Sequence, residues 1–246
     1  MQTSSNTVLV TGGASGIGLA IAERFLRAGS EVLICGRDKD KLAAAKEKHP
    51  KLHIRVCDVS SEAKRTQLFS WATTSFPALN VLVNNAGIQR RVDLSKAEPW
   101  EQTRQELLIN VEAPIHLSML FIAHLAKQQN PAIINITSGL SFTPLANVPV
   151  YSAAKAALHS FTLSLRHQLE KTPIKVIEIA PPAVNTDLGG PGLHTFGVAL
   201  DEFTDAVMSR LEKGDLEIAY GFSEKASHAS RAELDQLFKQ MNAQTH

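Results

Sequence analysis

Short apolar runs rich in β-branched residues alternate along this chain with longer segments of helical periodicity. An apolar run of about four to eight residues is typical of a buried strand, and a longer amphipathic segment is typical of a helix. Strands and helices that alternate through right-handed crossovers form a parallel sheet with helices on both faces. The sequence therefore predicts an α/β fold with a doubly wound, mostly parallel sheet. The predicted strands are Thr7–Thr11, Glu31–Cys35, Leu52–Cys57, Val81–Asn84, Ala132–Thr137 and Lys175–Ala180, and the predicted helices are Ile17–Ala28, Asp38–Glu47, Glu62–Phe76, Gln102–Gln128 and Val150–Glu170.

Capping residues support three of these helix boundaries. Asp38 and Ser61 are placed to be N-caps, since their short polar side chains accept hydrogen bonds from the first free N–H groups of a helix. Gly29 follows the first predicted helix and is expected to end it.

No repeat, low-complexity segment or interdomain linker divides the 246 residues. A hydrophobic share of 44% is enough to bury a sizeable core, and α/β folds of this length are routinely single domains. Residues 1–246 are therefore expected to form one domain. The irregular stretch 185–200 contains Gly189-Gly190-Pro191-Gly192 and is expected to form a short, mobile substrate lid.

The charge balance gives no electrostatic reason to expect nucleic acid or an anionic membrane as a partner, since the formal net charge is +1. The longest candidate membrane stretch, Ile115–Ala126, is too short and is interrupted by His116, Ser118 and His124. No basic region precedes an apolar run at the N-terminus, so no secretory signal is predicted. We therefore expect a cytoplasmic protein.

Cys35 and Cys57 each end a predicted strand. They are expected to be reduced, buried thiols and could be neighbours in the sheet, which suits a reducing compartment. The nine histidines are scattered, with no His-x-x-x-His pair set beside acidic residues, and no metal site is predicted.

The first predicted strand ends in the glycine-rich turn Thr11-Gly12-Gly13-Ala14-Ser15-Gly16-Ile17-Gly18, which leads into a helix. Glycines let such a turn approach a pyrophosphate, whose charge sits favourably at the helix N-terminus. The spacing Gly-x-x-x-Gly-x-Gly differs from the common dinucleotide fingerprint. Close packing of helix on strand is the alternative explanation for the glycines, but their place between the first strand and the first helix favours nucleotide binding.

Tyr151 lies four residues before Lys155 in a predicted helix, which places a phenol and an ammonium group on one helix face. A cation in this place can lower the pKa of a phenol from about 10 toward neutrality, so that the phenol exchanges protons at cellular pH. The other tyrosine, Tyr220, has Glu224 in the corresponding position. One Tyr-x-x-x-Lys pair is weak evidence alone; its place downstream of the glycine-rich turn indicates catalysis beside a nucleotide.

Together, the motifs resemble those of the short-chain dehydrogenase/reductase family over nearly the whole chain. Within the family the chain is most similar to the DltE-like oxidoreductases, through the runs 137–140, 157–161 and 220–225. The resemblance implies a single-domain Rossmann fold with a seven-stranded sheet. The residues that carry it, in the family's order, are the glycine-rich turn, Asp58-Val59, Asn84-Asn85-Ala86-Gly87, Asn110, Ser138, Tyr151 and Lys155.

The resemblance also implies a catalytic set of four residues. Tyr151 would exchange a proton with the substrate oxygen while the nicotinamide exchanges a hydride. Lys155 would hold the ribose hydroxyls and stabilise tyrosinate. Ser138 would hydrogen-bond the substrate oxygen and polarise it. Asn110 would hold the water that links Lys155 to solvent.

The implied cofactor site follows the ends of the strands. Asp58 is expected to meet the adenine, although a plain carboxylate at the start of a helix is the alternative. Gly87 would let the chain pass close to the adenine ribose. The implied cofactor-binding residues are Gly12, Ser15, Gly16, Ile17, Gly18, Arg37, Asp58, Val59, Asn85, Ala86, Gly87, Tyr151, Lys155, Pro181, Val184 and Thr186.

The choice of cofactor depends on the end of the second strand. NAD enzymes usually place an acidic residue there to bind the ribose 2′-hydroxyl. Gly36 occupies that position here, and Arg37 follows, where a guanidinium can bind a 2′-phosphate. Asp38 comes one residue late and could be a helix cap instead. The sequence favours NADP(H), with NAD(H) as the alternative.

The chain departs from the family pattern after the last predicted strand. The family usually has Pro-Gly followed by a threonine, and this chain has Pro181-Pro182-Ala183-Val184-Asn185-Thr186. Proline removes a hydrogen-bond donor and fixes φ, so the backbone beside the nicotinamide is expected to differ slightly. Val184 and Thr186 remain able to hold the carboxamide.

The resemblance thus implies an NADP(H)-dependent oxidoreductase for a small or medium carbonyl or alcohol substrate. A regulatory or sensor protein that binds NADP(H) without turnover is the alternative, and the complete set of Ser138, Tyr151 and Lys155 argues against it. The long helices around Asn110 and Tyr151 carry more apolar surface than one sheet face covers, and a homodimer or homotetramer is expected.

Overall fold

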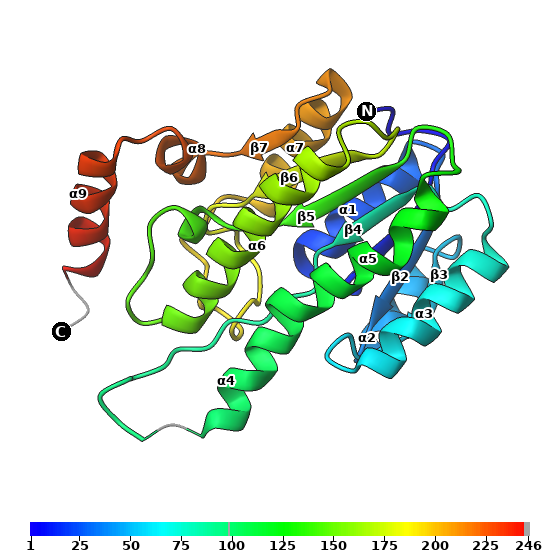
Figure 1. The fold of residues 1–246 in the computed structure, drawn as a ribbon. Coiled ribbons are helices and arrows are strands. Elements are labelled where there is room, and N and C mark those ends of the chain that lie inside the picture. Colours follow the sequence, from blue (N-terminus) through cyan, green and yellow to red (C-terminus); the bar gives the residue numbers. More distant parts are fainter. Residues whose placement is uncertain (98, 244–246) are drawn as a thin grey trace.

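Seven parallel strands form one sheet in the computed structural model, which describes residues 1–97 and 99–243 (Figure 1). The order across the sheet is β3-β2-β1-β4-β5-β6-β7, so the predicted α/β class and doubly wound topology are confirmed. Every pairing in this sheet is parallel. The strands are β1 (Thr7–Thr11), β2 (Glu31–Gly36), β3 (His53–Val56), β4 (Val81–Asn84), β5 (Ala132–Ile136), β6 (Lys175–Ala180) and β7 (Glu217–Ala219).

Helices connect the strands and cover both faces of the sheet, and α3, α5 and α6 lie across the face turned toward the viewer in Figure 1. A short 3-10 turn, Gly139–Ser141, precedes α6. The helices are α1 (Gly16–Arg27), α2 (Lys39–Lys48), α3 (Glu62–Ser75), α4 (Trp100–Leu107), α5 (Ala113–Leu125), α6 (Pro149–Gln168), α7 (Leu200–Lys213), α8 (Phe222–Ser227) and α9 (Arg231–Asn242).

The alternation of side chains along each strand produces two apolar cores. Val8 and Val10 of β1 pack with α1, α2 and α7 on one face, and Leu9 packs with α3, α5 and α6 on the other. All five residues of β1, and all of β4 and β5, are buried, which explains why the strands read as continuous apolar runs.

The capping predictions are confirmed. The Asp38 carboxylate accepts hydrogen bonds from the backbone N–H groups of Asp40 and Lys41, each at 3.0 Å. The Ser61 hydroxyl accepts one from Lys64 at the start of α3. Gly29 has a φ of 88° directly after the α1 terminus, a conformation that favours glycine.

The predicted helix Gln102–Gln128 is a composite. It begins at Trp100 as α4, passes through a π-helical segment at Leu108–Glu112, and continues as α5 to Leu125. Within the described residues, Trp100–Leu125 is the one helical run long and apolar enough to cross a membrane by length and composition. A core helix of a soluble protein meets the same criteria, and 39% of its apolar window is buried.

The C-terminal third contains elements that the apolar patterns did not reveal. β7 has three residues at the edge of the sheet, and α7, α8 and α9 follow the predicted lid. Figure 1 shows α9 set apart from the sheet, beyond α8. The ends of the segment 185–200, predicted to be a lid, lie close together, because Val184 and Val198 form a parallel bridge.

Cys35 and Cys57 are buried and free, as predicted. Interaction with Cys57, together with burial, raises the pKa of the Cys35 thiol.

Candidate active site

The predicted site residues follow the carboxyl ends of five strands. The glycine-rich turn follows β1, Asp58 lies just beyond β3, Asn85 follows β4, Ser138 follows β5 and Pro181 follows β6. The direction of the chain across the sheet reverses between β1 and β4, and open α/β sheets bind ligands in the crevice outside such a point. The fold therefore brings the predicted groups to one edge of the sheet.

The glycine-rich turn is held against the end of β4. Gly12 has a φ of 64°, and a Cβ at this position would lie 2.8 Å from the Cα of Ala86. The Asn85 amide donates to the carbonyls of Thr11 and Gly12 at 2.9 and 3.2 Å. A Cβ at Gly18 would lie 2.3 Å from the same amide nitrogen. Close packing against the segment after β4 therefore explains Gly12 and Gly18, as the alternative explanation predicts. These glycines can still bind a ligand as well.

The Thr11 hydroxyl completes this junction. It accepts hydrogen bonds from the backbone N–H groups of Asn85 and Ala86 at 3.0 and 3.1 Å, and donates to the Val83 carbonyl. Sequence reasoning had given Thr11 no role of its own, although a threonine at a strand end beside a glycine turn is a recognisable signal. The junction fixes the loop that leads to Gly87.

The N-terminus of α1 is free to receive an anion. Ser15 occupies the N-cap position but makes no side-chain capping bond, and the first turn contains no acidic residue. Gly16 begins the helix with a φ of 53°, and Ile17 packs against the first core. Unsatisfied N–H groups and the helix dipole both favour a phosphate at this place. The turn therefore fits the pyrophosphate of a dinucleotide.

At the far end of this edge lie the residues predicted to meet the adenosine. Arg37 is exposed at the end of β2. The Asp58 carboxylate accepts bonds from the N–H and hydroxyl of Ser60, at 3.0 and 2.8 Å, and so forms a local turn ahead of α3. Val59 is buried in the second core. Asp38 is engaged in capping α2, as the alternative reading had it.

Asn110 lies in the π-helical segment and is buried. Its amide nitrogen donates to the Ile88 carbonyl at 2.7 Å, and its amide oxygen accepts from the Ile88 N–H at 2.9 Å. A Cβ at Gly87 would lie 3.4 Å from the Asn110 amide oxygen and 3.7 Å from Lys155 Nζ. Asn110, Gly87 and Lys155 therefore converge on one point.

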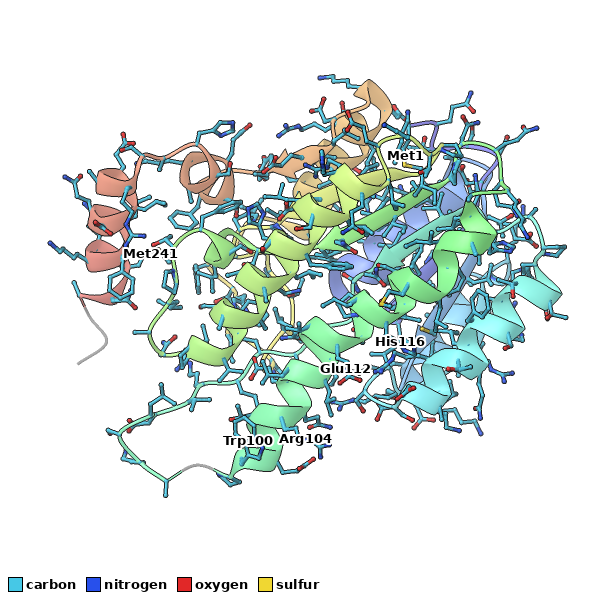
Figure 2. All side chains as sticks on the ribbon, viewed as in Figure 1. Met1, Trp100, Arg104, Glu112, His116 and Met241 are labelled. Atoms are coloured by element: carbon cyan, nitrogen blue, oxygen red, sulfur yellow. The ribbon has the colours of Figure 1, made fainter. Side chains whose placement is uncertain are left out.

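A buried arginine anchors this π-helical segment from the outside. Arg65 of α3 is 1% exposed; its guanidinium pairs with Glu112 at 2.5 Å and donates to His116 Nδ1 at 3.0 Å. Figure 2 labels Glu112 and His116 on this helical run. The π-helical segment that contains Asn110 is thus held by Arg65 on one side and by the Asn110–Ile88 hydrogen bonds on the other.

Lys155 is 4% exposed and its ammonium donates to the Ile136 carbonyl at 2.7 Å. Burial lowers the pKa of Lys155 to about 8. An ammonium group has three protons to donate, so at least one remains for a ligand after this bond. Lys155 Nζ lies 5.6 Å from the centre of the Tyr151 ring.

Tyr151 is 6% exposed, and the Ser138 side chain interacts with its phenol. Burial raises the pKa of Tyr151 well above its ordinary value, and the interaction with Ser138 lowers it only in part. This differs from the lowered phenol pKa that the sequence predicts. Removal of water destabilises tyrosinate more than the neutral phenol.

The segment after β6 closes the site. The Pro181 carbonyl accepts from the Gly139 N–H at 2.9 Å, which ties this segment to the residue after Ser138. Val184 is buried, and Thr186 lies 3.6 Å from where a Cβ of Gly16 would stand. Val184 and Thr186 thus lie on the path from Ser138 to the glycine-rich turn.

Three groups near the site escaped the sequence reasoning. Glu106, one turn before Asn110, is a fully buried carboxyl whose charge acts on Tyr151. Ser223 of α8 packs against Gly139, where a Cβ would approach its hydroxyl to 2.3 Å. In the described part of the chain, His159, Glu178 and Glu217 form one group with potential metal-ligand atoms within 4.8 Å of one another. In the sequence, each of these residues falls within an ordinary helix or strand pattern, and nothing in that pattern marks it as part of a site.

Comparison with known proteins agrees with this geometry. The sequence profile of the short chain dehydrogenase family matches residues 6–193. The uncharacterized oxidoreductase DltE of Bacillus subtilis is 48% identical over 250 aligned positions, which cover 99% of both chains.

Solved structures give the same result. A short chain dehydrogenase from Burkholderia cenocepacia, solved in complex with NADP, is 26% identical with a TM-score of 0.85 over 98% of this chain and 99% of its own. A short chain dehydrogenase/reductase from Burkholderia phymatum, solved with NAD, has the same fold with a TM-score of 0.85 at 19% identity, over 96% of each chain. The chain therefore belongs to the short chain dehydrogenase family, a family of NAD(P)-dependent oxidoreductases.

Proposed function

We propose that the protein is an NADP(H)-dependent oxidoreductase that interconverts a small or medium carbonyl compound and its alcohol. The observation that carries this proposal is the buried phenol of Tyr151, which interacts with Ser138 and lies one helical turn before the buried ammonium of Lys155. These groups lie at the same sheet edge as a glycine turn that fits a pyrophosphate. When bound there, the nicotinamide nucleotide supplies or accepts the hydride.

Tyr151 holds the proton that the substrate oxygen gains or loses. In the reductive direction the phenol is protonated at neutral pH, as its raised pKa requires, and can donate to a developing alkoxide. Ser138 donates a second hydrogen bond to the same oxygen and so stabilises its negative charge. Both groups are nearly shielded from water, which strengthens these interactions.

Lys155 holds the ribose of the nucleotide and stabilises the charge of Tyr151. Its bond to the Ile136 carbonyl fixes the ammonium at the end of β5, and its remaining protons are available for the ribose hydroxyls. Its positive charge stabilises tyrosinate when Tyr151 has released its proton. Asn110, whose own amide is bound to Ile88, holds the adjoining loop in place.

Arg37 makes NADP(H) the preferred cofactor. No acidic side chain stands at the end of β2 to bind a ribose 2′-hydroxyl, because Gly36 occupies that position and Asp38 caps α2. The exposed guanidinium of Arg37 can bind a 2′-phosphate. The relative from Burkholderia cenocepacia binds NADP, which supports this choice, whereas the NAD-bound relative keeps NAD(H) as the alternative.

The proposed enzyme works in the cytoplasm on a diffusible substrate, without a nucleic acid or membrane partner. The net charge of +1 supports this part of the proposal. The DltE relative, whose substrate is not named, leaves the compound itself to be found by assay.

Turnover of NADPH tests the proposal. The wild-type protein should oxidise NADPH in the presence of at least one member of a panel of aldehydes and ketones. Tyr151→Phe should lower kcat by roughly 10²- to 10⁴-fold, the usual contribution of a general acid, while NADPH still binds. Tight NADPH binding without Tyr151-dependent turnover on any carbonyl would instead favour a sensor protein.

Replacement of Arg37 tests the cofactor preference. Arg37→Ala should weaken NADPH binding by about 10- to 100-fold, since it removes a charge-assisted phosphate contact, and should leave NADH binding nearly unchanged. Equilibrium fluorescence titrations at equal salt measure both affinities. Lys51→Ala, which removes an exposed charge outside the site, is the matched control. An unchanged preference in Arg37→Ala would show that the 2′-phosphate is not bound there.

A further inference from the structure

Glu178 is a charged residue in the middle of β6, a strand that is apolar apart from Glu178 and Lys175 at its start. It lies in β6 with a side chain that is 0% exposed, next to Ile177 and Ile179 of the first core. A carboxylate removed from water is strongly destabilised unless charged or hydrogen-bonding groups surround it. Its partners therefore indicate why a strand at the active site contains it.

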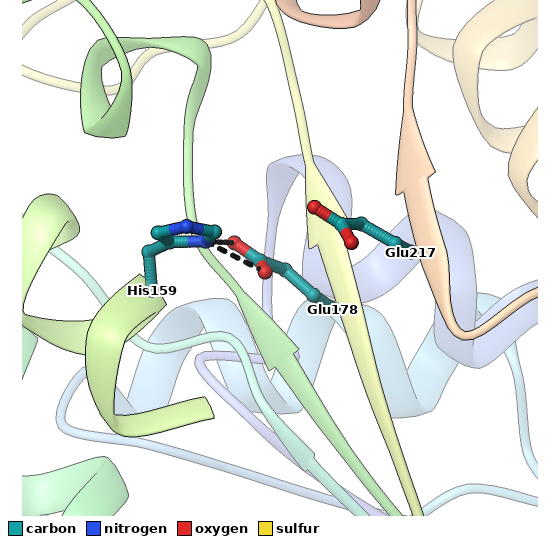
Figure 3. A group of neighbouring side chains, drawn as sticks. All are labelled: His159, Glu178 and Glu217. Atoms are coloured by element: carbon teal, nitrogen blue, oxygen red, sulfur yellow. Dashed lines mark hydrogen bonds and ion pairs between the residues drawn. The ribbon is translucent and has the colours of Figure 1, made fainter. Parts of the chain in front are cut away.

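Two side chains satisfy the Glu178 carboxylate. His159 Nδ1 of α6 lies 2.9 Å from each of its oxygens (Figure 3). The Thr137 hydroxyl donates to Oε1 at 2.6 Å. One carboxylate thus joins α6 to the residue that follows β5.

Both partners are neighbours of catalytic groups in the chain. Thr137 immediately precedes Ser138. His159 lies four residues after Lys155 and eight after Tyr151, on the same face of α6. The two halves of the proposed catalytic set, Ser138 on one side and Tyr151 with Lys155 on the other, are therefore both linked to Glu178 through one residue or a few turns of helix.

The charges around His159 favour its protonated form. Glu178 raises the pKa of His159 by hydrogen bonding, and Glu217 of β7 raises it further, while burial and Arg166 of α6 lower it. The Phe142 ring packs edge-on against the imidazole, with centroids 4.9 Å apart. An imidazolium next to a buried carboxylate forms an ion pair with little freedom to move.

We propose that Thr137, Glu178 and His159 form a positioning bridge that sets the place of the Ser138 hydroxyl relative to Tyr151. This inference rests on the proposed function, because it gives the bridge its purpose. The bridge touches neither substrate nor cofactor. It acts by holding the end of β5 and the helix α6 to one rigid point on β6, so that the Ser138 hydroxyl keeps its place beside Tyr151.

The same residues suggest a metal site, since Glu217 brings a third potential ligand atom within 4.8 Å. The observed contacts favour the bridge. Both Glu178 oxygens already lie at hydrogen-bond distance from His159, and a zinc ion would need ligand atoms at about 2.0–2.2 Å. Metal dependence is therefore an outcome that would overturn the bridge.

Substitution of Thr137 tests the bridge with the least disturbance. Thr137→Val keeps the shape of the side chain and removes the hydroxyl, whereas Thr137→Ser keeps the hydroxyl. We expect Thr137→Val to lower kcat for NADPH-dependent carbonyl reduction by roughly 10- to 100-fold, the cost of displacing a reacting group by about 1 Å. Thr137→Ser should restore most of it, and the KM for NADPH should stay within about twofold in both. Thr66→Val, at an exposed helix position, is the matched control.

The pH profile separates positioning from general destabilisation. Ser138 lowers the pKa of Tyr151, so a misplaced Ser138 leaves the phenol less acidic. The rising limb of alcohol oxidation, which reports loss of the Tyr151 proton, should move to higher pH in Thr137→Val by about half a unit or more. It should not move in Thr137→Ser. A variant that is merely less stable would lose active protein without moving this midpoint.

His159→Gln and Glu178→Gln test the other two residues of the bridge. Each should lower kcat and move the same limb, and combining either with Thr137→Val should add little further loss. His167→Gln, an exposed histidine on the same helix, is the control.

Three results would overturn the bridge. The first is a kcat and pH midpoint in Thr137→Val equal to those of the wild type, while wild-type turnover still depends on Tyr151. The second is loss of activity in EDTA that one equivalent of Zn²⁺ restores. The third is wild-type protein without Tyr151-dependent turnover, which would remove the proposed function and the bridge together; the first two leave the proposed function standing.

Discussion

At the scale of single residues, burial decides the charge of the groups around Tyr151. Tyr151, Lys155 and Glu106 are all at most 6% exposed. In each, burial shifts the pKa in the direction that favours the neutral form of the group. Burial raises the pKa of Glu106 to about 7, and the backbone N–H and guanidinium of Arg90 offset only part of this effect. Near neutrality this carboxyl is therefore divided between its two protonation states.

The raised pKa of Glu106 predicts a pH-dependent cost to folding. The unfolded chain releases the Glu106 proton near pH 4.5 and the folded chain near pH 7, so between these values the native state binds more protons and stability falls as pH rises. Glu106→Gln, which cannot ionise, should therefore be more stable relative to wild type at pH 8 than at pH 5, by at least about 1 kcal/mol. Urea unfolding at the two pH values measures the difference. Glu101→Gln, at an exposed position of α4, should show none, and an equal effect in both variants would contradict the role of burial.

Sequence alone predicts the proposed catalytic residues but not the buried groups that surround them. Tyr151, Lys155 and Ser138 fall into a motif whose spacing is visible in one dimension. Glu106 and Glu178 depend on which elements pack together: a glutamate within a helical pattern is usually exposed, and one within a strand run reads as an interruption. Their burial appears only when α4 packs on α6 and β6 takes its place between β5 and β7.

At the scale of elements, Asp38 at the start of α2 has two possible roles, as the N-cap of the helix or as a ligand of the cofactor ribose. Asp38 accepts two backbone hydrogen bonds at the end of β2, close to where an NAD enzyme would bind ribose. If Asp38 is a cap, its loss costs stability and leaves NADH affinity unchanged.

Asp38→Ala should lower the free energy of unfolding by about 1 kcal/mol, and the melting temperature by roughly 2–4 °C, because α2 loses its N-cap. Asp38→Asn should retain both, since asparagine caps equally well. Thermal melts and NADH titrations on the same samples give the two readouts. A large loss of NADH affinity at unchanged stability would make Asp38 a ribose ligand instead.

Most central elements could be predicted from sequence, and the peripheral ones could not. β1 and β4 agree with their predicted bounds, because buried parallel strands are apolar throughout. β7 has three residues with Glu217 at its start, too few to form a pattern. The π-helical segment around Asn110 leaves the apolar periodicity of the helix nearly intact, so its extra residue is invisible until the backbone is seen.

At the scale of the whole molecule, exposed apolar side chains support the predicted self-association. Trp100, Met119 and Leu163 are 66%, 64% and 42% exposed on the α4–α5 run and on α6, and Figure 2 labels Trp100 near the free end of α4. Large exposed apolar groups on long helices are typical of a surface that another subunit covers.

We therefore expect a homodimer or homotetramer, and expect charge on this surface to dissociate it. Size-exclusion chromatography with light scattering should give a multiple of 26.7 kDa for the wild type and a lower mass for the double variant Met119→Glu, Leu163→Glu. Leu216→Glu, an exposed leucine beside β7, should leave the mass unchanged. A wild-type mass of 26.7 kDa would contradict the prediction.

The contacts of the last two helices set an order for the maturation of the protein. Ser223 packs against Gly139, and Asn242 binds both Pro144 and Ala146 in the loop ahead of Tyr151. A chain that leaves the ribosome from its N-terminus completes β1, α1 and β4 long before these residues emerge. A nascent chain would thus acquire the proposed nucleotide cradle early, and the loop ahead of Tyr151 would be fastened only after Asn242 has emerged.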